Sequence, residues 1–188
     1  MPNIVSIKLI ILCSVVFGLG LVLGHFLVPS LTGTEIVEEL TEYFRPLVEF
    51  PPHVFVLLIF ANNFFKTLIL GLILGILIAI PPMIFAFLNG LIIGLVSSMV
   101  AERSGALFVL LGILPHGILE IPALLISCAL GVKVGLTVYD NIRNGGFGVG
   151  IVIRKFVKTY LKVVVPLLLV AAIVETYVTP LLLHFIHQ

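Results

Sequence analysis

A histidine and two glutamates stand inside apolar stretches of this sequence, where side chains that bind protons or cations are uncommon. His116 and Glu120 belong to the stretch Leu114-Pro-His-Gly-Ile-Leu-Glu-Ile-Pro122, and Glu175 lies in the last apolar stretch of the chain. Residues four apart in a helix lie on one face, so the side chains of His116 and Glu120 can meet. Counted from the ends of their stretches, all three residues fall at a similar depth, which predicts one polar cluster.

Three kinds of chemistry fit one imidazole and two carboxyl groups in apolar surroundings. The default interpretation is a hydrogen-bonded structural network, because a charged group at the middle of a bilayer costs at least ~2.5–3.5 kcal/mol. The second is a proton or ion pathway, which glutamates and histidines within membranes commonly mark. The third is a site for Zn²⁺ or another divalent metal with an open coordination position. The sequence has no His-Glu-x-x-His motif, so metal-assisted hydrolysis has less support.

Four other polar residues in apolar stretches are candidates for supporting this cluster. They are Asn62, Asn63, Lys66 and Asn89. Lys66 has two possible roles: its ammonium group can extend to the membrane surface, which is the favoured interpretation, or reach inward to a carboxylate on another helix. Asn89 has apolar residues on both sides, which favours a polar contact inside the bundle over a loop.

The composition predicts an integral membrane protein. Hydrophobic residues make up 61% of the chain and charged residues 10%, and the mean hydropathy is +1.33, far from the balance of a soluble globular domain. The net charge of +1 implies no basic surface for nucleic acid. Cys13 and Cys128 both lie in apolar stretches, which indicates small buried side chains rather than a disulfide or a cysteine metal site.

Five apolar stretches can cross ~30 Å of hydrocarbon as helices, which takes about 20 residues each. The expected spans are residues 9–28, 64–80, 83–100, 106–130 and 163–185. The fourth, at about 25 residues and ~38 Å, is longer than a straight crossing needs, and its two prolines predict a kinked or broken helix. The predicted fold is all-α: a polytopic transmembrane helix bundle of about five spans, forming a single membrane domain over residues 1–188.

The segments between the spans differ in charge. Residues 30–53 form an acidic connector ended by Pro51-Pro52, and residues 54–61 are expected near the membrane interface. Pro81-Pro82 predicts a bend or tight turn between the second and third spans. Residues 131–162 are predicted to form a basic loop, which belongs in the cytoplasm because positive charge favours that side. In a cell membrane, five spans then put the N-terminus inside and the C-terminus outside.

Three pairs of glycines at a spacing of four suggest close helix packing. The pairs are Gly20/Gly24, Gly71/Gly75 and Gly90/Gly94. Helices in lipid associate through small residues that let their backbones approach. Five spans also make a small bundle with limited interior for polar groups. These features predict a homo-oligomer within the lipid bilayer, a dimer in the simplest case.

Several of these motifs together resemble the stage II sporulation protein M family of membrane proteins. They are the stretch Leu114-Pro-His-Gly-Ile-Leu-Glu-Ile-Pro-Ala123, Asn62-Asn63, Gly71/Gly75, Asn89-Gly-Leu-Ile-Ile-Gly94 and Ala171-Ala-Ile-Val-Glu-Thr-Tyr-Val-Thr-Pro180. The match covers most of the chain from the second span onward, and its Pro-His-Gly-x-x-Glu core is the specific part. The sequence departs from the resemblance at Pro81-Pro82, where a more continuous helix is expected.

The resemblance implies a scaffold. The family's namesake in spore-forming bacteria holds peptidoglycan-remodelling enzymes at the septal membrane, and related proteins also occur in organisms that never sporulate, archaea among them. A non-enzymatic scaffold or organising subunit with membrane or envelope protein partners is therefore the first expectation. The alternatives are a small transporter or permease-like subunit that uses His116, Glu120 and Glu175, and an intramembrane metal-dependent hydrolase.

Overall fold

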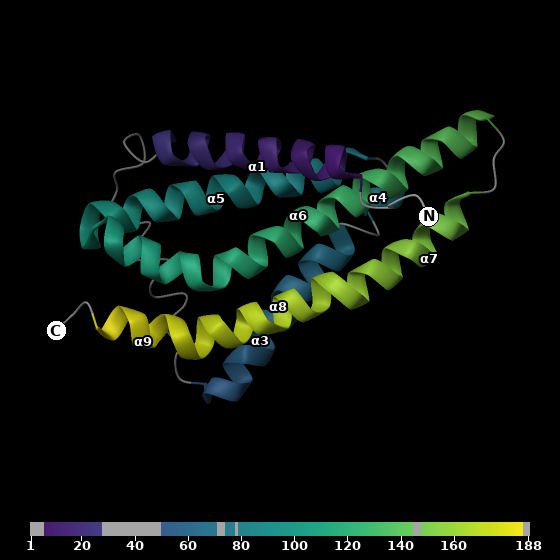
Figure 1. Ribbon diagram of the computed structural model, residues 1–188. Coiled ribbons are helices and arrows are strands. Elements are labelled where there is room, and N and C mark those ends of the chain that lie inside the picture. The colour runs from purple at the N-terminus through teal and green to yellow at the C-terminus, as the bar shows by residue number, and fades with distance from the viewer. Residues whose placement is uncertain (1–5, 28–49, 71–73, 78, 145–147, 186–188) are drawn as a thin grey trace.

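The computed structural model describes residues 6–27, 50–70, 74–77, 79–144 and 148–185. Its α-helices are α1 (Ile7–Leu27), α3 (Pro52–Leu68), α4 (Leu74–Leu77), α5 (Ile80–Ser104), α6 (Ala106–Asn144), α7 (Val149–Thr159), α8 (Val165–Ile173) and α9 (Thr179–His184). The described residues contain no strand, and the long helices pack side by side as a bundle (Figure 1). The prediction of an all-α fold is confirmed.

Four helices in the described part of the chain are long and apolar enough to cross a membrane. They are Ile7–Leu27, Ile80–Ser104, Ala106–Asn144 and the continuous helix Val149–His184, which contains α7, α8 and α9. The 17-residue α3 is a shorter apolar helix. These helices agree with the predicted number of about five, and the chain is a polytopic membrane protein.

The second predicted span, residues 64–80, has different bounds in the structure. Its helix, α3, begins at Pro52 and ends at Leu68, so residues 54–61, predicted near the interface, are part of the helix. Pro51 is extended, with ψ of 144°, as expected of a residue before proline, and the ring of Pro52 is compatible with a first helical turn. The proline pair therefore begins a helix.

Pro81 and Pro82 have the same role in α5. Both lie in its first turn, since the helix begins at Ile80. The first amides of a helix have no intrahelical partner, so a proline there removes no hydrogen bond. The predicted bend between the second and third spans is thus the start of α5, which then continues to Ser104 without a break.

The prediction that residues 131–162 form a basic loop is wrong for most of that segment. α6 extends to Asn144, and the next helix begins at Val149. Packing explains the extension, because a Cβ at Gly135 of α6 would lie 2.6 Å from the Gly75 carbonyl oxygen. This part of α6 is therefore held against α4. Positive charge marks the side on which a segment lies, but it does not end a helix.

α6 continues as an α-helix through both Pro115 and Pro122, so the alternative of a broken fourth span is wrong. Figure 1 shows that α6 is bent and changes direction in its first half. Each proline removes one backbone hydrogen bond and crowds the preceding turn, which is a common cause of a kink. The predicted kink is therefore present in a helix of 39 residues, longer than the expected 106–130.

α1 and α5 pack backbone to backbone through glycines. A Cβ at Gly20 would meet the carbonyl oxygen of Phe87, and a Cβ at Gly90 would meet that of Phe17. Equivalent approaches are made by Gly24 and Gly94. Four of the predicted packing glycines are therefore used inside one chain, where they cannot also form a contact between chains. Gly71 lies outside the described residues, and self-association stays a prediction.

Two buried apolar clusters share α6. The first joins α1, α5 and α6 through Cys13, Phe17, Phe85, Ala86, Leu124, Cys128, Ala129 and Val132. The second joins α6 to the last helix through Ala123, Leu130, Val134, Phe156, Tyr160, Val164 and Leu168. α6 is therefore the central helix of the bundle. Cys13 and Cys128 are fully buried and unpaired, as the sequence predicts.

The start of α1 and the end of α9 lie at opposite ends of the bundle (Figure 1). The end of α6 and the start of α7 lie at the same end as the start of α1. The predicted acidic connector, residues 30–53, falls largely outside the described residues.

Candidate functional site

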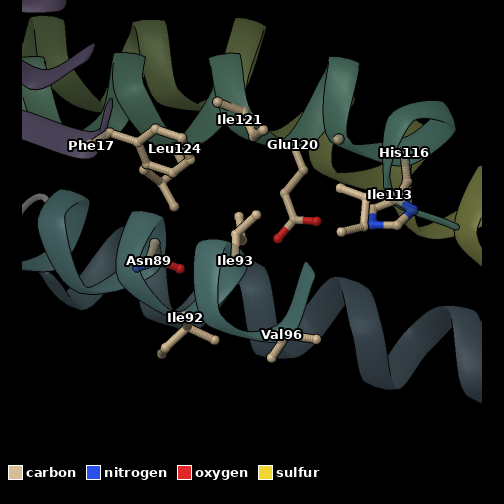
Figure 2. Close-up of a pocket in the computed structure, with 11 residues that line it drawn as sticks. Phe17, Asn89, Ile92, Ile93, Val96, Ile113, His116, Glu120, Ile121 and Leu124 are labelled. Carbon is tan, nitrogen blue, oxygen red and sulfur yellow. The ribbon is translucent and has the colours of Figure 1, made fainter. Parts of the chain in front are cut away.

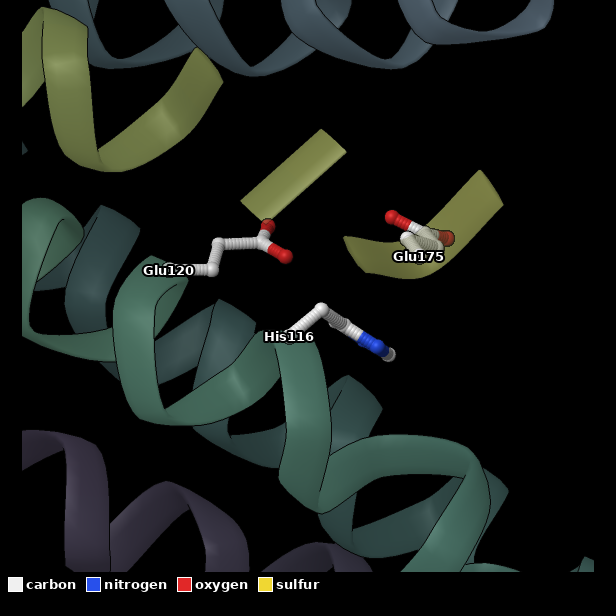
Figure 3. A group of neighbouring side chains, drawn as sticks. All are labelled: His116, Glu120 and Glu175. Atoms are coloured by element: carbon white, nitrogen blue, oxygen red, sulfur yellow. The ribbon is translucent and has the colours of Figure 1, made fainter. Parts of the chain in front are cut away.

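The structure brings His116, Glu120 and Glu175 together. One potential ligand atom from each, an imidazole nitrogen or a carboxylate oxygen, lies within 4.8 Å of the others. His116 and Glu120 project from one face of α6, and Glu175 approaches from the last helix (Figure 3). All three side chains are half-buried. The three residues that the sequence placed at one depth therefore form one cluster between two helices.

A π-helical segment carries Glu175. The last helix contains two such segments, Tyr160–Val164 and Val174–Val178, and in the second the Thr179 amide donates to the Val174 carbonyl. Pro180 follows directly and lacks the N–H for an ordinary helical bond, which favours a local widening of the helix. Such one-turn π segments are frequent at functional sites because they change the direction of a side chain.

The Nδ1 atom of His116 is buried and has no hydrogen-bond partner. Among the described residues, no hydrogen bond joins His116, Glu120 and Glu175 to one another. A buried polar atom without a partner is uncommon in folded proteins and calls for an explanation such as a bound ion or a functional role. The default interpretation of a direct hydrogen-bonded network therefore loses support, and a group that bridges the three side chains gains it.

A cavity of about 240 Å³ adjoins the cluster. It lies between α1, α5 and α6, and its lining residues are Phe17, Asn89, Ile92, Ile93, Val96, Ile113, His116, Gly117, Glu120, Ile121 and Leu124. Figure 2 shows the Glu120 carboxylate extending from α6 toward α5, with apolar side chains around it. Glu120 and His116 thus belong to both the cluster and the cavity, so the cavity gives one side of the cluster room for a small ligand.

Asn89 is the predicted supporting residue that lies at this cavity. Its side-chain Nδ2 donates to the Phe85 carbonyl at 2.8 Å, and the amide stands on the cavity wall (Figure 2). The predicted polar contact inside the bundle is therefore made with its own helix, one turn back. Its position on α5 adds a polar group opposite Glu120.

The other predicted supporting residues lie on α3, outside the cluster. Asn62 is exposed and Asn63 is half-buried, and the Asn63 carbonyl accepts a hydrogen bond from Thr67. Lys66 is exposed, which agrees with an ammonium group that extends outward. It is nevertheless close enough to Glu120 for their charges to interact. Lys66 therefore combines features of both predicted roles.

A second polar group in the bundle was not predicted. The Tyr160 hydroxyl donates to the Phe64 carbonyl at 2.7 Å and contacts the Thr67 hydroxyl at 2.8 Å. The Ser127 hydroxyl donates to the Thr67 carbonyl at 2.9 Å. This network joins α3, α6 and the last helix. Hydroxyl groups in helices commonly bond to their own backbone, so the sequence carries no signal that these side chains meet.

Comparison with known proteins places the chain in a family. The family model for stage II sporulation protein M matches residues 13–180. An uncharacterized protein of Methanocaldococcus jannaschii is 31% identical over 184 residues, which cover 92% of this chain and 81% of that protein. No solved structure matches. The match includes all three cluster residues and confirms the resemblance found in the motifs: the chain belongs to the stage II sporulation protein M family.

Proposed function

We propose that this chain is a non-enzymatic membrane scaffold, an organising subunit that holds partner proteins of the membrane or envelope. The family resemblance supports this role. The observation that carries the proposal is a helical hairpin, formed by the end of α6 and by α7, which projects past the start of α1 (Figure 1). A scaffold needs a surface outside the lipid on which partners can dock, and this hairpin supplies one.

The lengths of the two helices support a hairpin beyond the bilayer. α6 has 39 residues and the helix Val149–His184 has 36. These correspond to ~58 Å and ~54 Å, against a hydrocarbon core of ~30 Å. At a tilt of about 20°, the average for transmembrane helices, the length of each helix along the membrane normal is still well above the thickness of the hydrocarbon core. One end of each helix therefore reaches the aqueous phase.

The two helices of the hairpin pack together at a buried apolar cluster. Phe156 of α7 is fully buried and stacks on Tyr160, with ring centroids 5.7 Å apart and an angle of 10° between the rings. Both residues belong to the buried cluster that includes Leu130 and Val134 of α6. A preformed surface loses less conformational entropy on binding than a loop does, so it suits a docking platform.

The charge on the hairpin indicates the kind of partner. Its exposed basic residues are Arg143, Arg154 and Lys158, and Lys155 beside them is half-buried. Basic segments favour the cytoplasmic side, so the proposal places this end of the bundle inside the cell, with the N-terminus inside and the C-terminus outside. Complementary charge steers association, and a partner with an acidic cytoplasmic segment fits best.

Charge reversal on the hairpin tests the scaffold proposal. We expect Arg154→Glu with Lys158→Glu to abolish salt-sensitive cross-linking to partner proteins in native membranes, because like charges would then face the partner. Arg103→Glu is the matched control, since Arg103 is exposed at the end of α5, at the other end of the bundle. Unchanged cross-linking by the hairpin variant, with the protein folded and membrane-inserted, contradicts the proposal.

A small transporter or permease-like subunit is the second candidate. The unpartnered Nδ1 of His116 beside a cavity of about 240 Å³ favours it, because a glutamate and a histidine at a cavity inside a helix bundle commonly mark a path for protons or cations. Reconstitution in vesicles separates the two candidates. A transporter loses cation flux on Glu175→Gln, whereas a scaffold tolerates that change and shows no flux in either form.

A further inference from the structure

We propose that His116, Glu120 and Glu175 bind one divalent transition-metal ion, with Zn²⁺ the best fit, and that this ion ties α6 to the last helix. The inference goes beyond the scaffold role and does not depend on it. It rests on the donor set, the convergence of the ligand atoms, the charge of the site and the cavity beside it.

The donor set selects the class of ion. One imidazole nitrogen and two carboxylate oxygens form a ligand set that Zn²⁺ accepts. A site for Mg²⁺ or Ca²⁺ normally consists of oxygen ligands alone, and the histidine therefore shifts the preference toward a transition metal. The chain places no cysteine in the cluster, since Cys13 and Cys128 lie in the first buried apolar cluster.

The geometry fits a three-ligand site. His116 and Glu120 are four residues apart on one helical face, a spacing at which two ligands can share an ion. Glu175 closes the site from the other helix, and all three potential ligand atoms lie within 4.8 Å of one another. Zn²⁺ binds nitrogen and oxygen ligands at about 2.0–2.2 Å, which puts bound ligand atoms roughly 3–4 Å apart. Small side-chain rotations bring the cluster to that spacing.

The charges of the site call for a cation. Two carboxylates within a few ångströms repel each other when both are ionised. Lys66, which is exposed on α3, interacts with the charge of Glu120. A divalent ion would neutralise both carboxylates and would also give the imidazole a partner, since Nδ1 of His116 has none. The ion thus satisfies three polar side chains at once.

The cavity supplies a fourth coordination position. Glu120 and His116 both line the space of about 240 Å³ between α1, α5 and α6. A metal held by three protein ligands keeps one position for water or a small anion, and a site of this kind needs such a space. Asn89 lines the same cavity from α5.

Metal content of the purified protein tests the inference. The full chain, in mild detergent and without a histidine tag, is dialysed against Zn²⁺ and then against buffer, and the metal is measured by mass spectrometry. We expect about one Zn²⁺ per chain. Glu175→Gln keeps the size and polarity of the side chain and should lower affinity by at least about 100-fold, because losing a ligand should cost more than the roughly 10–100-fold typical of losing a residue that only supports a ligand. Glu102→Gln, an exposed carboxylate at the end of α5, is the matched control and should bind like wild type.

A second readout guards against variants that fail to fold. Co²⁺ in place of Zn²⁺ has visible absorption that reports its coordination, and His116→Gln should change that spectrum while Glu102→Gln does not. Zn²⁺ should also raise the unfolding temperature of wild type but not of Glu175→Gln or Glu120→Gln. Less than a tenth of an ion per folded wild-type chain, binding of Mg²⁺ alone, or equal affinities of wild type and Glu175→Gln would each overturn the inference.

Discussion

The hydroxyl of Tyr160 joins the last helix to α3, in a polar network that also reaches α6. It donates to the Phe64 carbonyl and contacts the Thr67 hydroxyl, while Ser127 donates to the backbone of Thr67. Its ring is 1% exposed and packs against Phe64, with centroids 5.7 Å apart. Removing only the hydroxyl separates the contribution of the polar network from that of the packing.

We expect Tyr160→Phe to lower the free energy of unfolding by about 1 kcal/mol, because the acceptors it leaves keep helical partners of their own. Tyr160→Ala should cost about 3–5 kcal/mol, since it also empties the volume of the ring. Unfolding in detergent with increasing denaturant measures both. Tyr177→Phe is the control, because Tyr177 is exposed, and a loss as large as that of Tyr160→Phe would contradict the assignment.

At the scale of elements, α1 and α5 pack closely because the glycines at their contact have no side chain to keep the two backbones apart. Gly20 of α1 faces the Phe87 carbonyl with no room for a Cβ, whereas Gly18 of the same helix has nothing within 4 Å of that position. The two glycines differ only in what faces them, so they form a matched pair within one helix.

We expect Gly20→Ala to destabilise the protein by about 1–3 kcal/mol, because the methyl group forces the two backbones apart. Gly18→Ala should be neutral or stabilising by up to about 1 kcal/mol, since alanine is the better helix former. Thermal unfolding in detergent compares them. Similar unfolding temperatures for the two variants would mean that the helices are not in close contact at Gly20.

The π-helical segment Val174–Val178 is the element that directs Glu175. Pro180→Ala restores a backbone N–H, which should let this segment adopt ordinary α-helical hydrogen bonds. A register change of one residue would turn the Glu175 side chain by about 100°, away from the other two ligands. We expect this variant to bind Zn²⁺ about tenfold more weakly although no ligand is changed. Pro166→Ala, next to the other π segment, should bind like wild type, and equal affinities would argue against this role of Pro180.

At the scale of the whole molecule, the bundle has two ends of different character. The basic hairpin of α6 and α7 lies at the end where α1 begins, and the turn between α5 and α6 lies at the other (Figure 1). The native Cys13 and Cys128 are fully buried, so a single introduced cysteine reports its own position.

We expect Arg143→Cys to react with a membrane-impermeant thiol reagent only from the cytoplasmic side and Glu102→Cys only from the outside. The reason is that positive charge is retained in the cytoplasm and α6 crosses the bilayer between these positions. Labelling in intact cells and in inverted vesicles measures this. Reaction of both positions from the same side would contradict the proposed orientation.

The sequence by itself determined the class of protein and the members of the site. Hydropathy and length predict helices that cross a membrane, because each is a local property of the chain. The depth and spacing of His116, Glu120 and Glu175 predict that they meet, because isolated polar groups are costly in lipid. The glycine pairs likewise predict close packing, though not which helix each pair would face.

Only the tertiary structure decided the partners and the helix ends. α6 continues past residue 130 because Gly135 packs on α4, which no pattern within α6 reveals. The contacts of Gly20 with Phe87 and of Tyr160 with Thr67 join residues far apart in sequence, so no local pattern predicts them. The π segment at Glu175 adds a change of register that hydropathy does not record. In lipid, helices associate through van der Waals packing and hydrogen bonds, because lipid tails are as apolar as the helices. Which helices pack together therefore depends on the shapes of their folded surfaces, which hydropathy does not describe.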